Sequence, residues 1–121
     1  DGLDVSRTNL LNPGKKAQTP WITQVLSEVD APVIAATDHI KLYADQVREW
    51  VPGIYKVLGT DGFGRSDSRV KLREHFEVNR HYVVLAALTA LVEKGDIKPA
   101  VVTKAIKDFG IDVNKMNPIF A

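Results

Sequence analysis

Two short apolar runs, separated by a segment with helical periodicity, constrain the fold of this chain more than any other feature. The runs cover residues 33–36 and 55–58, and Lys56 is the only charged residue in them. Runs of this length are typical of strands covered on both faces of a parallel sheet. A right-handed crossover through a helix would place both strands in one sheet. The sequence therefore predicts an α/β fold built on buried parallel strands.

The segment between the two runs has the spacing of an amphipathic helix. Its apolar residues recur every three or four positions and include Ile40, Tyr43, Val47 and Trp50. Pro52 and Gly53 end the pattern, because proline cannot continue a helix. We therefore expect one helix from Asp38 to the residue before Pro52.

Two short helices are expected at the N-terminus. Asp4 would cap a helix over residues 5–11, and Thr19 would cap a second helix that begins at Pro20. Trp21, on the second helix, has core spacing, as Tyr43 and Trp50 have further along. Burial explains these aromatic residues best, and a subunit contact is the alternative.

The sequence predicts three more helices in the C-terminal half. Ser66 or Asp67 would cap a helix that buries Val70, Leu72 and Phe76.

The next two helices have clear boundaries. Asn79 would begin a helix over residues 80–94, which is so apolar that it must be covered on more than one side. An amphipathic helix over residues 99–109 would end at Gly110, and residues 111–121 read as irregular. Two strands cannot cover all of these helices, so we expect residues outside this chain to complete the sheet.

Composition fits one domain and excludes several functions. The 121 residues are 45% hydrophobic and carry 16 basic and 15 acidic side chains, so no net field attracts nucleic acid or an anionic membrane. No apolar stretch could span a bilayer. The absence of cysteine excludes disulfides and thiol chemistry. Because the chain begins at Asp1 rather than Met, we expect a processed product or a piece of a longer protein.

A glycine-rich segment between the second strand and the next helix is the main candidate site. We call residues 59–69 the glycine loop. Gly59, Gly64, Arg65 and Ser66 have the spacing of a phosphate-binding loop, in which backbone N–H groups hold phosphate. This interpretation makes residues 59–66 the anion or nucleotide site of a small regulatory domain, with Asp38 as a magnesium ligand.

Three features favour a scaffold role for the glycine loop instead. Arg65 replaces the lysine that normally reaches the phosphates, and Asp61 would place a negative charge inside the cradle. The supposed magnesium strand also precedes the loop instead of following it. In the scaffold interpretation, glycines permit a tight path, Phe63 packs under the sheet edge, and Ser66 or Asp67 caps the next helix.

Other reactive groups form no recognisable constellation. His39, His75 and His81 are scattered, with no metal-ligand spacing between them. No serine stands in a nucleophile elbow, and Asp45 and Glu49 lie on an expected solvated helix face. We predict no catalytic, cofactor-binding or metal-binding residue in this chain.

Several stretches together resemble the C-terminal end of the homodimeric bacterial pyruvate dehydrogenases. They cover residues 36–48, 57–69, 72–78 and 113–118, so the resemblance extends over essentially the whole chain. A looser similarity reaches the transketolases, whose C-terminal domain carries a D-x-F-G-x-S turn between a strand and a helix. Here that turn comprises Asp61, Phe63, Gly64 and Ser66.

The resemblance implies a fold. It is a three-layer α/β sandwich with a mixed, largely parallel sheet, like the transketolase C-terminal domain, whose first strand lies upstream of Asp1. Residues 1–121 would form a partial domain of this kind, with residues 95–121 as a helical C-terminal extension.

The resemblance also implies a function for the longer protein. That protein would be a cytoplasmic homodimeric enzyme that uses thiamine diphosphate and Mg²⁺, both bound by other domains, to decarboxylate pyruvate. It would pass the acetyl group to the lipoyl group of a dihydrolipoyl acetyltransferase core. This chain would be an inactive module that contacts the remaining domains and the second subunit. Its one family signature is a structural or interface loop that comprises Asp61, Gly62, Phe63, Gly64, Arg65, Ser66, Asp67 and Arg69.

Overall fold

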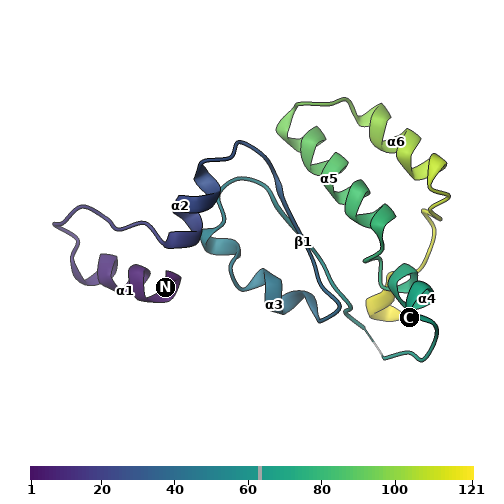
Figure 1. Ribbon diagram of the computed structural model, residues 1–121, viewed down its shortest axis with the longest axis horizontal. Coiled ribbons are helices and arrows are strands. Elements are labelled where there is room, and N and C mark those ends of the chain that lie inside the picture. The colour runs from purple at the N-terminus through teal and green to yellow at the C-terminus, as the bar shows by residue number, and fades with distance from the viewer. Residues whose placement is uncertain (63) are drawn as a thin grey trace.

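A two-stranded parallel sheet lies at the centre of the molecule, with helices on both sides (Figure 1). The computed structural model describes residues 1–62 and 64–121. The strands are β1 (Val33–Ala36) and β2 (Tyr55–Leu58), with Val33 opposite Tyr55 and Ala36 opposite Leu58. Both strands have the bounds that the sequence predicts. The predicted α/β class, with parallel strands joined through a helical crossover, is confirmed.

The crossover between the strands is shorter than predicted. It consists of α3 (Lys41–Asp45) and a 3₁₀ turn, η1 (Arg48–Trp50), instead of one helix from Asp38 to the residue before Pro52. At the break, the Arg48 guanidinium pairs with Asp45 at 2.7 Å and donates to the carbonyl oxygen of Tyr55 at 2.7 Å. α3 contacts β2 on one side of the sheet.

The longest helix, α5 (Arg80–Lys94), covers the other side of the sheet (Figure 1). Asn79 caps it as predicted, because its Oδ1 accepts a hydrogen bond from the backbone N–H of Tyr82 at 3.1 Å. Gly95 ends it with a φ of 90°. α5 contacts both strands and also α6 (Pro99–Asp108), and Ala90 has no exposed surface. The prediction that this helix is covered on more than one side is confirmed.

The two N-terminal helices begin differently from the predictions. α1 (Gly2–Leu11) starts before Asp4, which lies in its first turn and caps nothing. α2 (Trp21–Ser27) receives no capping bond from Thr19. Instead, the Asp1 carboxylate accepts a hydrogen bond from the backbone N–H of Trp21 at 2.7 Å. A cap supplied from 20 residues away has no local sequence signature.

The C-terminal segment is more ordered than predicted. A 3₁₀ turn, η2 (Pro118–Phe120), lies within residues 111–121, and its Asn117 Oδ1 accepts a hydrogen bond from the N–H of Ile119 at 3.1 Å. α6 ends at Asp108, one residue before the predicted end, and Gly110 follows with a φ of 64°, the left-handed stop that the sequence predicts.

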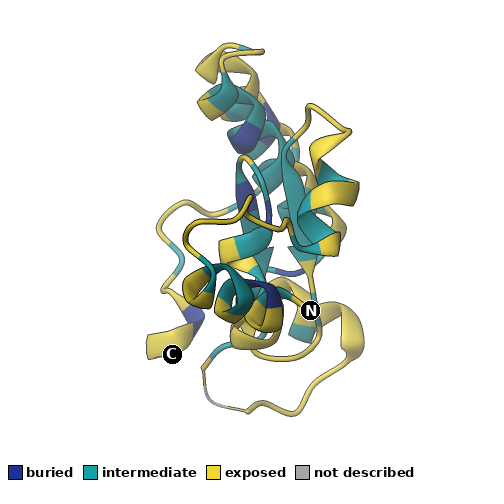
Figure 2. Ribbon diagram, turned by 90° about the vertical axis from the view of Figure 1, so that its left-hand side faces the viewer, coloured by how far each residue is buried: buried dark blue, intermediate teal, exposed yellow. Residues whose placement is uncertain are grey.

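Few residues are buried within this chain, as Figure 2 shows, and many large apolar side chains are exposed. Most strand residues are half-buried, Tyr55 is buried and Ala36 is exposed, so the strands are less buried within this chain than the sequence predicts. Trp21 and Tyr43 are 68% and 64% exposed, and Val70 is 75% exposed, which corrects their predicted burial. Trp50 is half-buried against α1, where its Nε1 donates to Ser6 Oγ at 3.3 Å.

Across residues 1–62 and 64–121, no helix combines the length and the apolar character that crossing a membrane requires.

Candidate functional site: the glycine loop at the carboxyl edge of the sheet

The glycine loop leaves the carboxyl end of β2 through a tightly packed turn (Figure 1). Gly59 is buried, and a Cβ atom there would lie 2.8 Å from the backbone nitrogen of Lys41 and 2.9 Å from the carbonyl oxygen of His39. The N–H of Thr60 donates to the same His39 carbonyl at 2.9 Å. Glycine at position 59 therefore allows the loop to lie directly against the chain that leaves β1.

Asp61 has a structural task in the loop. Its Oδ1 accepts a hydrogen bond of 2.9 Å from the backbone N–H of Lys41, the first residue of α3. This N–H has no partner within the helix, and a carboxylate there also complements the helix dipole. Thr60 adds a second link, because its hydroxyl donates to the Asp38 carbonyl oxygen at 2.8 Å. Asp61 thus caps a helix that lies 20 residues earlier in the chain.

Gly62 brings the loop into contact with the C-terminal turn. It has a φ of 115°, and a Cβ atom on it would overlap the carbonyl oxygen of Pro118. Pro118 is itself buried. Both the dihedral and the close approach require glycine at this position.

The second half of the loop is exposed and leads to α4 (Arg69–His75). Ser68 is the N-cap of this helix, since its Oγ accepts from the N–H of Lys71 at 3.4 Å, and neither Ser66 nor Asp67 takes that role. Asp67 supports the cap by accepting from the N–H of Ser68 at 2.7 Å. The predicted placement of Phe63 falls outside the described residues.

This geometry does not form a phosphate cradle. In a phosphate-binding loop the helix begins at the basic residue, whereas α4 begins at Arg69, four residues after Arg65. The Asp61 carboxylate is engaged by α3, and the Asp38 carboxylate pairs with Arg73 Nη2 at 3.3 Å. Asp38, the magnesium ligand of the nucleotide interpretation, is therefore already paired with Arg73, and Asp61, which argues against that interpretation, caps α3.

Two neighbouring cavities of about 840 and 470 Å³ lie at the same edge of the sheet. Both are lined by Asp38, Arg69, Arg73 and Val78, and the glycine loop forms one wall of the smaller cavity. Their charges are mixed, so neither cavity concentrates one sign of charge. Among the described lining residues, no nucleophilic side chain is paired with a general base.

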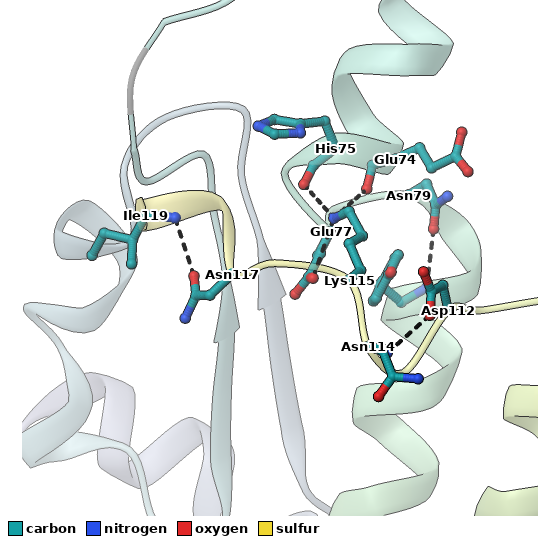
Figure 3. Close-up of polar contacts among 10 residues, drawn as sticks. Glu74, His75, Glu77, Asn79, Asp112, Asn114, Lys115, Asn117 and Ile119 are labelled. Atoms are coloured by element: carbon teal, nitrogen blue, oxygen red, sulfur yellow. Dashed lines mark hydrogen bonds and ion pairs between the residues drawn. The ribbon is translucent and has the colours of Figure 1, made fainter. Parts of the chain in front are cut away.

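The C-terminus of α4 is closed by a residue far away in the sequence (Figure 3). Lys115 Nζ donates to the carbonyl oxygens of His75 at 2.6 Å and Glu74 at 3.3 Å, and it pairs with Glu77 Oε1 at 3.3 Å. The His75 carbonyl accepts no backbone hydrogen bond among the described residues, whereas the Glu74 carbonyl also accepts one from the N–H of Glu77 at 3.2 Å. A cation at this end of the helix also complements the helix dipole. Sequence reasoning missed Lys115, because it lies in a stretch with no periodicity.

Two ionisable side chains near this cap have shifted pKa values. Burial lowers the pKa of His75 below its usual value, and the positive charges of Arg65 and Lys115 lower it further, against a smaller opposite effect of Glu77. His75 Nε2 is inaccessible to solvent and has no hydrogen-bond partner among the described residues. Burial, with the carboxylates around it, raises the pKa of Tyr82.

The other two histidines contact different aromatic side chains and form no cluster with His75. His39 packs edge-on against Tyr43 with ring centroids 5.6 Å apart, and His81 stacks on Phe109 at 4.7 Å. Within the part of the chain that the structure describes, no three His, Cys, Asp or Glu side chains lie close enough to hold a metal ion.

Fold and loop together define a class of protein: an α/β domain in which a glycine loop at the carboxyl edge of a parallel sheet connects structural elements. Residues 6–79 match the family of the transketolase-like TK C-terminal domain. The chain belongs to this family.

The curated relatives are much longer than this chain. It is 59% identical over 120 residues to the pyruvate dehydrogenase E1 component of Pseudomonas aeruginosa, which covers 98% of the chain and 14% of the relative. It is 53% identical over 122 aligned residues to the E1 component of Escherichia coli K12, and 52% identical over the same length to that of Haemophilus influenzae. Each of these two alignments covers the whole chain and 14% of the relative.

Proposed function

We propose that this chain is a supporting domain of a thiamine diphosphate-dependent pyruvate dehydrogenase. The longer enzyme releases the carboxylate of pyruvate as CO₂. Two electrons from the remaining two-carbon unit reduce a lipoyl disulfide while the acetyl group moves to one of its sulfurs. The lipoyl group belongs to a dihydrolipoyl acetyltransferase core. The observation that carries the proposal is the similarity of 52 to 59% over nearly the full chain to three E1 components.

The residues of this chain do not fit the cofactor. Mg²⁺ takes oxygen ligands with near-octahedral geometry. The carboxylates at the sheet edge are engaged instead: Asp38 pairs with Arg73, and Asp61 caps α3. Thiamine diphosphate and Mg²⁺ therefore belong, in this proposal, to domains outside the chain. This chain alone has no activity.

The exposed surface supports a covered position in a larger subunit. Its accessible area is 8682 Å², whereas a compact monomer of 13.4 kDa exposes about 6,500 Å². The surplus of about 2,200 Å² has the size of a stable protein interface. Exposed large apolar side chains contribute to it on α1, α2, α3 and the C-terminal turn, and they include Leu10, Trp21, Tyr43 and Phe120.

We assign these surfaces to the other domains of the same subunit and to the second subunit of a homodimer in the cytoplasm. In this assignment, residues 1–121 form a partial transketolase-like C-terminal domain, and residues 95–121 are its helical extension. The glycine loop then has a structural or interface role, through Asp61 and Gly62 in particular.

A calorimetric titration tests the proposal. The isolated chain is expected to show no heat of binding with thiamine diphosphate and Mg²⁺, whereas the full-length polypeptide that carries it binds both and decarboxylates pyruvate. Micromolar binding of the cofactor by the isolated chain would contradict the supporting role. A full-length polypeptide without pyruvate decarboxylation would contradict the enzymatic assignment. Titration with ATP tests the nucleotide interpretation. Saturable ATP binding that is lost in Gly64→Val would support that interpretation again.

A further inference from the structure

The C-terminal segment makes two contacts that join distant parts of the chain. We infer that residues 111–121 act as a strap, with Lys115 as its anchor, that fixes the glycine loop relative to α4. The inference goes beyond the proposed function, and it rests only on contacts within this chain.

The first contact is at the C-terminus of α4. The chain turns there through a left-handed residue, since Glu77 has a φ of 61°. Two bonds define this turn: the N–H of Val78 donates to the Arg73 carbonyl at 2.9 Å, and that of Glu77 donates to the Glu74 carbonyl at 3.2 Å. Glycine normally occupies such a position, because a Cβ atom makes the left-handed conformation unfavourable.

Lys115 compensates for this unfavourable turn. Its ammonium group pairs with the Glu77 carboxylate and also donates to the His75 carbonyl, as Figure 3 shows. The same Nζ lies 5.9 Å from the centre of the Tyr82 ring at the start of α5. One side chain of the tail therefore holds the end of α4 and the beginning of α5 together. Bonds from a charged donor such as this one are stronger than neutral ones.

The second contact, between Pro118 and Gly62, carries the effect to the glycine loop. Asn117 fixes the turn that follows Lys115, because its Oδ1 accepts from the N–H of Ile119 at 3.1 Å (Figure 3). This turn buries Pro118 and places its carbonyl group directly against Gly62. The strap thus runs from the end of α4 to the loop that precedes α4.

The strap holds one wall of the smaller cavity. Gly62, Gly64 and Arg65 of the glycine loop line this cavity of about 470 Å³ opposite Leu72 and Phe76 of the α4 region. Because Lys115 is bonded at the α4 side and Pro118 contacts the loop side, loss of the anchor is expected to loosen the loop as well as the tail.

Hydrogen–deuterium exchange in the full-length polypeptide tests the strap without substrate or cofactor. Lys115→Met removes the ammonium group and keeps a long apolar side chain. We expect exchange in residues 59–68 and in residues 111–121 to become about tenfold faster, while the centre of α5 stays protected. Lys104→Met, at an exposed site on α6, is the matched control and should change neither region.

Gly62→Ala probes the same coupling from the other end. Its added methyl group pushes against Pro118, so exchange in residues 111–121 should accelerate although the change lies in the loop. If Lys115→Met does not fold, exchange in Gly62→Ala alone tests whether the tail and the glycine loop are coupled. Faster exchange in the tail alone after Lys115→Met, or in the loop alone after Gly62→Ala, would overturn the inference. Because exchange is read without catalysis, this failure is distinct from that of the proposed enzymatic function.

Discussion

Two regions of the molecule differ in how much of their apolar surface this chain buries. One is the sheet with α5, and the other is the N-terminal pair of helices, α1 and α2. β1, β2 and α5 contact one another, and they contain Tyr55, with 9% of its surface exposed, and the fully buried Ala90. In contrast, α1 buries only Val5, and α2 buries no residue and leaves Trp21 exposed. The same kinds of apolar residue occur in both regions. The difference shows that an apolar stripe identifies a face that must be covered, and that its partner can lie outside the chain.

The largest expected effect comes from removing a tyrosine of the central region. Tyr55→Ala deletes a buried ring whose hydroxyl donates to the Ala44 carbonyl at 2.7 Å, and it should lower the free energy of unfolding by about 3 kcal/mol. Tyr43→Ala, at a 64% exposed ring, should cost less than about 0.5 kcal/mol in the same chain. Urea denaturation followed by tryptophan fluorescence measures both. Equal losses would remove the distinction between the two regions.

Two glycines of the loop give the next largest contrast. Gly59→Ala places a methyl group against the backbone of His39 and Lys41 and should cost about 2 kcal/mol. Gly64→Ala meets no atom within 4 Å and should change stability by less than about 0.5 kcal/mol. Thermal denaturation of the two variants compares the packed and open halves of the loop. A larger cost at Gly64 would mean that the exposed half carries the constraint.

Removing the cap of α3 should have a smaller effect. Asp61→Ala leaves the N–H of Lys41 without its partner, and we expect a loss of about 1 kcal/mol. Asp108→Ala, at an exposed site at the end of α6, is the control with the same loss of charge. If both variants were equally stable, Asp61 would have no structural role, and the anion interpretation of the loop would regain support.

The smallest expected effect is a pH dependence from His75. Its pKa is lowered in the folded protein, so below the usual value of about 6.5 the unfolded chain binds a proton more readily than the folded one. Stability should therefore be complete above that pH and fall as the pH drops from it toward the lowered folded pKa. Urea midpoints between pH of about 7.5 and about 5 measure this slope, which His75→Phe should flatten and His39→Gln should leave intact. If the dependence of stability on pH were unchanged in His75→Phe, groups other than His75 would cause the loss of stability at low pH.

Local sequence signals predicted the helices and strands whose boundaries depend on neighbouring residues and whose packing partners lie in this chain. The bounds of β1, β2 and α5 were predicted as found, because short apolar runs, an Asn79 cap and a Gly95 stop are local signals. Asp61 was predicted only as part of a structural or interface loop, and the helix that it caps could not be identified from spacing.

Contacts between distant residues were the ones that sequence reasoning missed. The Asp1 cap of α2, the Lys115 cap of α4 and the contact of Pro118 with Gly62 join positions 20 to 56 residues apart. No periodicity links such positions. The predicted burial of Trp21 and Tyr43 was wrong for this chain because a helical stripe does not specify which molecule covers it.

The supporting role requires that the apolar faces of α1 and α2 are covered by the rest of a longer polypeptide. Hydrogen–deuterium exchange of residues 2–27, compared between the isolated chain and the full-length polypeptide, measures this coverage. We expect rapid exchange in the isolated chain and at least about tenfold slower exchange in the full-length polypeptide, with the centre of α5 protected in both. Identical exchange of residues 2–27 in the two proteins would contradict it.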